Sequence, residues 1–501
     1  MKSLLFICVD QLRADALGYV GNQVVKTPHL DALAAGAIQF RNHFTCASPC
    51  GPSRASLHTG TYPMLHRVVA NGAPMPDDIP TLPRMLRNAG FDPTLFGYTD
   101  VPVAPRNAPL TLEALHRPFS ADTLPDFRVG LLQNYEGPTD WIRHLADQGV
   151  HPTTDDPFSI WDRGVSRSEG FSRAPTRYSA EDSDTAFLAS RVIEEIETTG
   201  DTGFCIHAAF LKPHPPFQAP EPYNLMFRAA DMPRPRAPLA VDHPFFEAFS
   251  TLQADSTTFD AEMNLGILTP EQVLEARAVY YGLIYELDQW IGHIMTALKT
   301  QGVYDETLIV LTSDHGELLG DYGAWGKTHV LDPAWRIPLL MKPPGCHTPR
   351  VVDALTESVD ILPTILDYCG LHIHPDINGR SLRALCEGQI PGQWRDAVMC
   401  ELHVGDPIDQ GYEQLLKIPS DQLGVVCYRT RTHKLVVFQA FESLLFEIDS
   451  AGGEHPVSDP VRQAQMTEAV LRHRLNQQSR SGACLRVGQI MQSTPGPRFH
   501  G

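Results

Sequence analysis

A short segment of this 501-residue chain combines residue types that suit chemistry on an oxyanion. From Cys50 to Gly60 it reads Cys-Gly-Pro-Ser-Arg-Ala-Ser-Leu-His-Thr-Gly. Pro52 is compatible with the first turn of a helix, because its missing N–H group would have no intrahelical partner there. This predicts Cys50 just ahead of a helix N-terminus, where free backbone N–H groups and the helix dipole favour an anion. Arg54 adds a positive charge one turn further on.

The same string resembles the signature of the type I sulfatases, Cys-x-Pro-Ser-Arg-x-x-Leu-x-Thr-Gly. In that family a formylglycine-generating enzyme oxidises the cysteine after translation, and the hydrated aldehyde is the nucleophile. A lone Cys-x-Pro would favour a buried structural thiol, as most free cysteines are. The longer string favours formylglycine at Cys50.

Further motifs of the family occur in the family's order along nearly the whole chain. They are Val9-Asp10-Gln11-x-Arg13-x-Asp15, Pro213-His214-Pro215-Pro216-Phe217, Ser313-Asp314-His315-Gly316-Glu317 and Gly326-Lys327. The chain is most similar to the branch that holds phosphonate monoester hydrolases and related arylsulfatases of the alkaline phosphatase superfamily. Many sulfatases begin their metal site with two adjacent aspartates, whereas this chain, like that branch, has Gln11 in the second position.

The resemblance implies one divalent metal site. Its ligands would be Asp10, Gln11, Asp314, His315 and an oxygen of the modified Cys50. Such oxygen-rich ligand sets suit Ca²⁺ or Mg²⁺, and the single imidazole makes Mn²⁺ suitable as well.

The resemblance also implies roles for three charged or titratable side chains. Arg54 would hold the aldehyde hydrate, and Lys327 and His214 would neutralise developing charge and protonate the leaving group. Taken alone, Lys327 could be a solvated lysine and His214 a loop histidine. The Pro-His-Pro-Pro-Phe string, and the distance of Lys327 after the Asp-His pair, favour the catalytic interpretation.

The resemblance implies three substrate-binding residues: Asn71 and Tyr98, which match family positions that touch the substrate or the hydrate, and Asp100. The alternatives are a turn asparagine, because Asn71-Gly72 is a common turn pair, and a packed aromatic ring at Tyr98. Asp100 departs from the phosphonate-hydrolysing relatives, which carry a neutral hydroxyl residue there. A carboxylate would repel an anionic ester unless it is paired, for instance with Arg106.

Two apolar runs predict the strands that position the metal ligands. Leu4–Val9 and Thr307–Thr312 have the length and continuous apolar character of parallel strands that are buried on both faces. The first run ends at Asp10 and the second at Asp314-His315. A single aspartate at a strand end is usually a turn or helix cap, but two such ends and the helix start described above favour a common site. Parallel strands bring their carboxyl ends to one sheet edge, where ligands bind.

Helical segments alternate with these strands. Thr27–Leu33 is typical of a capped helix with Pro28 at its first position, and Gly36 should end it. Thr269 opens a long helical pattern that continues to about Lys299. This alternation predicts a doubly wound α/β fold, and the resemblance implies a large, mostly parallel, alkaline-phosphatase-like sheet flanked by helices.

The pattern changes towards the end of the chain. We predict a catalytic domain over residues 1–384 and a smaller C-terminal α+β domain over 385–501. Residues 102–180 and 213–260 lack clear periodicity and favour long loops over the sheet edge. The C-terminal domain should contain antiparallel strands at Val425–Thr430, Lys434–Phe438 and Leu444–Ile448.

Composition limits the partners and the compartment. The net charge of −19 argues against nucleic acid and anionic membrane surfaces, although a metal and a few cations can still attract an anionic substrate. Ten scattered cysteines without zinc or redox spacing predict a reducing, cytoplasmic compartment. The N-terminus mimics a short signal peptide, but we expect a first strand there, and no run is long enough to cross a bilayer. The resemblance implies a dimer or tetramer.

The first functional expectation is a metal- and formylglycine-dependent hydrolase of small sulfate monoesters, similar to arylsulfatases and promiscuous towards phosphonate monoesters and phosphodiesters. The alternative is a phosphonate monoester hydrolase or phosphodiesterase with the same residues. A metal phosphatase or mutase with an unmodified cysteine is a third interpretation. A non-catalytic binding relative is the fourth, and it would predict eroded ligand positions.

Overall fold

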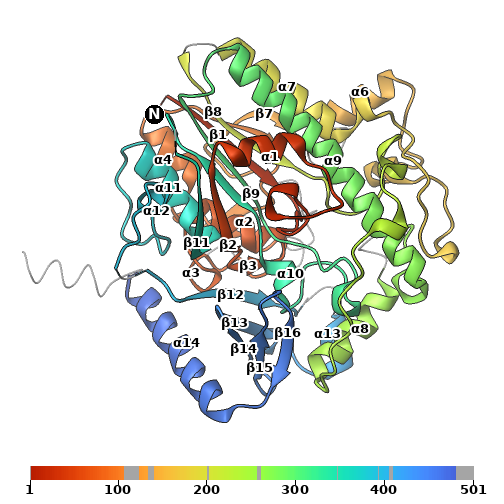
Figure 1. Cartoon of the computed structure of the whole chain (residues 1–501), viewed down its shortest axis with the longest axis vertical. Helices are drawn as coiled ribbons and strands as arrows, with labels where there is room; N and C mark the ends of the chain where they lie inside the picture. The colour runs from red at the N-terminus through yellow and green to blue at the C-terminus, as the bar shows by residue number, and fades with distance from the viewer. Residues whose placement is uncertain are drawn as a thin grey trace, which may run out of the picture.

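The computed structural model describes residues 2–106, 123–133, 140–199, 202–256, 261–346, 348–392, 394–405 and 410–480. Within these ranges an eight-stranded sheet forms the centre of the molecule (Figure 1). Its strands, in sheet order, are β11 (Arg350–Glu357), β2 (Ile38–Phe44), β10 (Leu339–Lys342), β9 (Thr307–Ser313), β1 (Ser3–Val9), β8 (Cys205–Phe210), β5 (Pro93–Gly97) and β7 (Arg128–Leu132). Only β10 runs antiparallel to its neighbours, so the predicted, mostly parallel sheet is confirmed.

The two predicted apolar strands lie side by side at the centre of this sheet. β1 pairs in parallel with β9, with Val9 opposite Ser313, and with β8 on its other side. Every residue of β1 and of β9 is buried, which is why both segments are continuous apolar runs. The pairing brings Asp10 and Asp314 to the same sheet edge, as the sequence predicted.

Helices cover both faces of the main sheet. Leu5, Ile7 and Val9 pack among residues of α1 (Pro28–Ala35), α7 (Asp184–Thr199) and α9 (Pro270–Thr300). Leu4 and Phe6 point to the other face, where they pack with the helices α2 (Cys50–Thr59), α4 (Leu82–Asn88), α11 (Ile361–Tyr368) and α12 (Arg383–Cys386). This double covering is the architecture expected of a doubly wound sheet.

The predicted helix starts differ in how they are capped. Thr269 forms a capping box at the start of α9, as its sequence pattern indicates. Thr27 precedes α1 but makes no side-chain cap. Instead the Asp288 carboxylate, from α9, accepts hydrogen bonds from the backbone N–H groups of His29 and Leu30. The cap of α1 is therefore a tertiary contact.

A second, six-stranded sheet lies beside the main one (Figure 1). It consists of β16 (Glu454–Val457), β15 (Leu444–Ile448), β14 (His433–Phe438), β13 (Gly424–Thr430), β12 (Ala397–His403) and β3 (Ala47–Ser48). The three predicted antiparallel strands are confirmed. α14 (Pro460–Arg480) packs on this sheet through Met466 and Val470. Because β3 pairs with β12, the second sheet reaches the segment just before Cys50. The domain boundary near residue 385 stays a prediction.

The two stretches predicted as loops contain regular structure. In the first, β7 adds an edge strand to the main sheet and α6 (Asp140–Asp147) follows, while residues 107–122 and 134–139 lie outside the described ranges. In the second, α8 (Pro244–Asp255) packs Phe245 and Phe249 into the core of the second sheet. Apolar burial at these two rings thus overrides the irregular sequence pattern. The remaining α-helices and strands of the described ranges are α3 (Pro63–His66), β4 (Met75–Pro76), β6 (Val103–Ala104), α10 (Asp332–Trp335) and α13 (Gly411–Leu416).

Two further observations bear on the sequence expectations. The nine cysteines within the described ranges are all free. None of the helices in those ranges combines the length and apolar character that crossing a bilayer requires. The cytoplasmic location stays a prediction.

Buried histidines should make the fold sensitive to acid. His329 lies among the rings of Phe245, Phe246 and Phe249, and burial together with the charge of Lys434 lowers its pKa to about 3. The unfolded chain protonates this histidine near pH 6.5, so stability is lost as the pH falls from there towards 3. Through this histidine the wild type should lose about 3 kcal/mol of unfolding free energy between pH 7 and pH 4, and His329→Phe should lack this part of the loss. Urea unfolding of both proteins at the two pH values measures this; an equal loss in both would contradict it.

Candidate active site

Cys50 is the first residue of α2, one position further into the helix than the sequence predicted, since Pro49 is the N-cap. All ten residues of this helix are buried. The backbone N–H of Gly51 donates to the side-chain oxygen of Asn71 at 2.9 Å. A Cβ atom on Gly51 would lie 3.0 Å from the carbonyl oxygen of Asp100, so a glycine allows this close approach. Asn71 therefore holds the helix start beside Cys50, and its predicted substrate contact stays a prediction.

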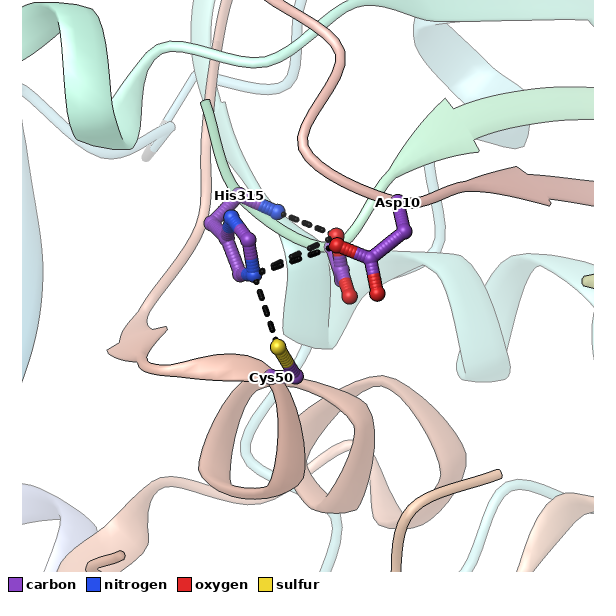
Figure 2. Close-up of side chains that lie close together, drawn as sticks. Asp10, Cys50 and His315 are labelled. Carbon is purple, nitrogen blue, oxygen red and sulfur yellow. Dashed lines mark hydrogen bonds and ion pairs between the residues drawn. The ribbon is translucent and has the colours of Figure 1, made fainter. Parts of the chain in front are cut away.

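Four buried side chains converge at the carboxyl edge of the main sheet. Potential ligand atoms of Asp10, Cys50, Asp314 and His315 all lie within 4.8 Å of one another. His315 Nε2 is 3.2 Å from the Cys50 sulfur, 3.6 Å from Asp10 Oδ1 and 3.7 Å from Asp314 Oδ1. Figure 2 shows His315 facing both Asp10, at the end of β1, and Cys50, at the start of α2. The structure thus brings together residues from three distant parts of the sequence.

This cluster fits a divalent cation. His315 Nδ1 is 3.1 Å from the Gly316 carbonyl, which can only accept, so Nδ1 carries the proton and Nε2 offers its lone pair to the cluster. Burial lowers the pKa of His315, which favours the neutral form that binds metals. Within the described part of the chain, the buried Asp10 Oδ1 has no hydrogen-bond partner. An unpaired buried carboxylate oxygen is unfavourable unless a cation satisfies it.

Arg54 lies behind the two carboxylates and is fully buried. Its Nε donates to Asp314 Oδ2 at 2.8 Å, and one terminal nitrogen donates to Asp10 Oδ2 at 3.0 Å. The other terminal nitrogen donates to the Tyr98 carbonyl, and the guanidinium lies 4.1 Å from the centre of the Tyr98 ring. The Tyr98 hydroxyl also donates to Asp10 Oδ2. Both side chains therefore brace the carboxylates, and their predicted contacts with hydrate and substrate stay predictions.

Gln11 connects this cluster to Lys327 and His214. The Gln11 amide oxygen accepts a hydrogen bond from Lys327 Nζ at 2.8 Å, and its amide nitrogen donates to Glu317. Lys327 Nζ is also 2.8 Å from His214 Nε2. The imidazole Nδ1 of His214 lies 2.6 Å from the Pro215 carbonyl and must donate to it, so Nε2 accepts from the lysine.

The proton of this pair resides on the lysine. Burial and the charge of Lys327 lower the pKa of His214 to about 3, so the imidazole is neutral at physiological pH. Burial acts against the charge of Lys327, but Cys50 and Asp10 raise its pKa above the usual lysine value. Lys327 is therefore the cation and proton carrier next to Cys50, and His214 is a neutral acceptor.

The predicted pairing of Asp100 with Arg106 is wrong. Arg106 forms an exposed bidentate ion pair with Asp78 at 2.8 and 2.9 Å. Asp100 is buried and adopts a left-handed backbone conformation with φ of 55°, so it lies inside while Arg106 lies on the surface. Burial raises the pKa of Asp100 to about 8, with Asp10 adding to the effect and Arg54 opposing it. The Asp100 carboxyl is thus mostly protonated near neutral pH.

Several residues that hold the site were quoted in the motifs without a role. Ser53 donates to the Asp314 carbonyl, and Ser313 donates to the His315 carbonyl. Glu317 accepts from Gln11. Tyr280, from the middle of α9, donates to the Gln11 carbonyl at 2.7 Å, and nothing in the sequence around it indicates this contact.

Comparisons with known proteins agree with this geometry. The family model described as Sulfatase matches residues 2–371, and the model of the N-sulphoglucosamine sulphohydrolase C-terminal region matches 320–440. The chain is 34% identical over 466 residues to a multifunctional alkaline phosphatase superfamily protein of Trinickia caryophylli, with 89% of each sequence covered.

Two solved structures are similar over almost the whole length. The phosphonate monoester hydrolase of Silicibacter pomeroyi gives a TM-score of 0.86 at 37% identity, with 95% of this chain and 96% of that chain covered. The enzyme of the same name from Agrobacterium radiobacter gives 0.85 at 33% identity, with the same coverage. Given the matched family model, the fold and the assembled site, this chain belongs to the sulfatase family of the alkaline phosphatase superfamily.

Proposed function

We propose that this protein is a metal- and formylglycine-dependent hydrolase of sulfate monoesters, similar to the arylsulfatases, that also accepts phosphonate monoesters and phosphodiesters. One observation carries the proposal. Cys50, in its Cys-x-Pro-Ser-Arg motif, opens a buried helix with its sulfur 3.2 Å from His315 and within the Asp10–Asp314 cluster. A cysteine there is placed to provide the nucleophile at a metal site.

Asp10, Asp314, His315 and the modified Cys50 would hold the cation. The amide oxygen of Gln11 could join them, because an amide oxygen has two lone pairs and Lys327 occupies only one. We propose Ca²⁺ or Mn²⁺, with Mg²⁺ as a further candidate, because carboxylate oxygens suit the hard cations and imidazole suits manganese. When bound, the cation would polarise the ester oxyanion and activate a hydroxyl of the aldehyde hydrate.

Three residues of the chain orient the ligands and stabilise charge at the site. Arg54 orients both carboxylates through its two hydrogen bonds. Lys327 places a positive charge next to Cys50 and has one N–H left after its hydrogen bonds to Gln11 and His214. This group can stabilise negative charge and protonate the leaving group. His214 accepts from another N–H of the lysine and so fixes the direction of the ammonium.

An unmodified thiol suits this site less well. Burial and the negative charge of Asp10 raise the pKa of Cys50 well above that of an ordinary thiol. A thiol is a nucleophile only as the thiolate, so an unmodified Cys50 would be a poor one. This supports the modified residue over a phosphatase or mutase that uses the thiol.

A second candidate function is phosphonate monoester hydrolysis as the main activity. The two similar phosphonate monoester hydrolase structures, at 37% and 33% identity over 95% of this chain, favour it. Asp100 favours sulfate. The family resemblance implies a neutral hydroxyl residue at this position in phosphonate-hydrolysing relatives. The Asp100 carboxyl ionises as the pH rises through about 8, and its ionised form would repel the more concentrated charge of a phosphonate.

We further propose maturation of Cys50 by a formylglycine-generating enzyme, a homodimer or homotetramer, and a cytoplasmic location. The Cys-x-Pro-Ser-Arg string supports the first, and family resemblance supports the second. The nine free cysteines of the described ranges agree with a reducing compartment. The net charge of −19 argues against nucleic acid or an anionic membrane surface as partner, whereas a metal and a few cations at the site can still attract a small anionic ester.

Cys50 should carry the aldehyde. Mass spectrometry of the tryptic peptide from active protein should show formylglycine in place of the thiol. Cys50→Ala should lose orders of magnitude in kcat, and Cys50→Ser should retain at most slow activity, because neither can provide the hydrate. Active protein whose peptide contains only the thiol would exclude this mechanism.

A divalent cation should be required. Exhaustive chelation should abolish hydrolysis, and a single added cation should restore it, because Asp10 and Asp314 would otherwise face each other without a counter-charge on that side. Asp314→Ala should lower kcat more than Gln11→Ala does, since it removes a charged ligand rather than a neutral one. Undiminished turnover of metal-free protein would be incompatible with the site.

Parallel kcat/KM measurements on an aryl sulfate and an aryl phosphonate monoester test the substrate class. Wild type should favour the sulfate, and Asp100→Thr should raise the phosphonate value relative to the sulfate value. The shift should be on the order of 1 kcal/mol, or several-fold in rate, because the carboxylate repels the phosphonate transition state more strongly. It should be larger at pH 9 than at pH 7, since the pKa of Asp100 is about 8.

An unchanged ratio at both pH values would show that Asp100 does not discriminate, and would leave phosphonate hydrolysis as the better-supported main activity. Hydrolysis of neither ester by matured, metal-loaded protein would reject the proposed function itself.

A further inference from the structure

Glu317 is a buried carboxylate that the proposed chemistry leaves without a role. It lies two residues after His315 and is fully shielded from solvent. One of its oxygens accepts from the backbone N–H groups of Leu319 at 2.8 Å and Gly326 at 2.6 Å. Its other oxygen accepts from the Gln11 amide nitrogen. Burial raises the pKa of Glu317, while these N–H groups act in the opposite direction.

The Gln11 amide lies between two groups of opposite hydrogen-bonding character. A carboxylate only accepts, and the Lys327 ammonium only donates. With Glu317 at its nitrogen end and Lys327 at its oxygen end, the amide has a single orientation that satisfies both. The Gln11 backbone is fixed as well, since its N–H donates to Asp314 and its carbonyl accepts from Tyr280. The side chain therefore has little freedom beyond an amide flip.

Glu317 also fixes the loop that carries Lys327. Gly326, whose N–H Glu317 accepts, directly precedes Lys327 in the chain. The Leu318 N–H donates to the Gly326 carbonyl at 2.9 Å, which closes the loop from the other side. One carboxylate thus sets both partners of the Gln11–Lys327 hydrogen bond.

We propose that Glu317 is a positioning residue that sets the amide orientation of Gln11 and, through Gln11 and Gly326, aims the Lys327 ammonium at the reacting group. The inference rests on the proposed function, because Gln11 and Lys327 act in that site. It adds a buried chain of contacts, Glu317–Gln11–Lys327–His214, in which the acceptor-only carboxylate sets the direction of the Gln11 amide.

A charge exchange tests the proposal. Glu317→Gln is isosteric but can present an NH₂ group to Gln11. The Gln11 amide nitrogen then has no acceptor at position 317, so the amide oxygen is no longer held towards Lys327. We expect kcat/KM to fall about 10- to 100-fold, as for other residues that orient a site. Adding Gln11→Glu places the acceptor-only carboxylate at position 11, where it can accept from both Lys327 and the new amide at position 317. The net charge of this double variant equals that of wild type. The double variant should recover about tenfold or more over Glu317→Gln.

A second readout is independent of turnover. The acetylation rate of Lys327, followed by mass spectrometry, should rise in Glu317→Gln because the ammonium loses a fixed acceptor, and it should return towards wild type in the double variant. The matched control is Glu357→Gln. Glu357 is equally buried and accepts from the Met399 N–H and the Tyr62 hydroxyl, both at 2.7 Å, but lies outside the site. It should lower the melting temperature without changing the acetylation of Lys327.

The outcomes separate the two proposals. If wild type hydrolyses neither ester while the acetylation rates still follow this pattern, the proposed function fails and the positioning role stands. A double variant no closer to wild type than Glu317→Gln in acetylation rate would overturn the positioning role, whatever its activity. If Glu317→Gln does not fold, Gln11→Glu replaces it as the single variant: two facing carboxylates should disturb Lys327, and the double variant should again be closer to wild type.

Discussion

The site depends on one guanidinium. Parallel pairing of β1 with β9 forces Asp10 and Asp314 together in a buried place, where two carboxylates would repel each other strongly. Arg54 donates to Oδ2 of each, which stabilises both negative charges and leaves both Oδ1 atoms facing His315. It therefore decides which oxygens are available to a cation. Because Arg54 lies one turn after Cys50, the same contact anchors the helix start to the sheet edge.

The second sheet supports the site, although every site residue precedes residue 330 in the sequence. Lys434, buried in β14, donates to the Val330 carbonyl at 2.6 Å and to Asp332 at 3.1 Å, and Arg429 of β13 also pairs with Asp332. On the other side of the site, β3 pairs with β12 just before Cys50. The second sheet thus holds the segment that enters α2 and the segment that follows Lys327. A buried ion network of this kind fixes geometry more than it adds stability.

The sequence predicted those features that depend on local pattern or on a motif. The buried strands Leu4–Val9 and Thr307–Thr312 were evident because both faces are apolar. The cluster of Asp10, Cys50, Asp314 and His315 was implied by the family motifs, supported by two strand ends and a helix start. What could not be predicted depends on contacts between distant segments. Asp288 caps α1 although Thr27 precedes it, and Arg106 pairs with Asp78 although Asp100 is also acidic and close in sequence. In both cases the partner depends on which side chains the fold buries and which it leaves at the surface, and no local spacing in the sequence encodes this.

Burial also decides which residue carries the proton at the substrate side of the site. By its ordinary pKa, a histidine would be the acid of choice near neutral pH, and a lysine would be a fixed charge. Here His214 is neutral because it is buried against Lys327, and Lys327 stays charged because the carboxylates of Asp10 and Asp314 raise its pKa. In the proposed mechanism the acid is therefore an ammonium with a high pKa, which suits leaving groups that depart as strongly basic oxyanions. Because it interacts through charge rather than shape, the same ammonium can serve sulfate and phosphonate esters alike.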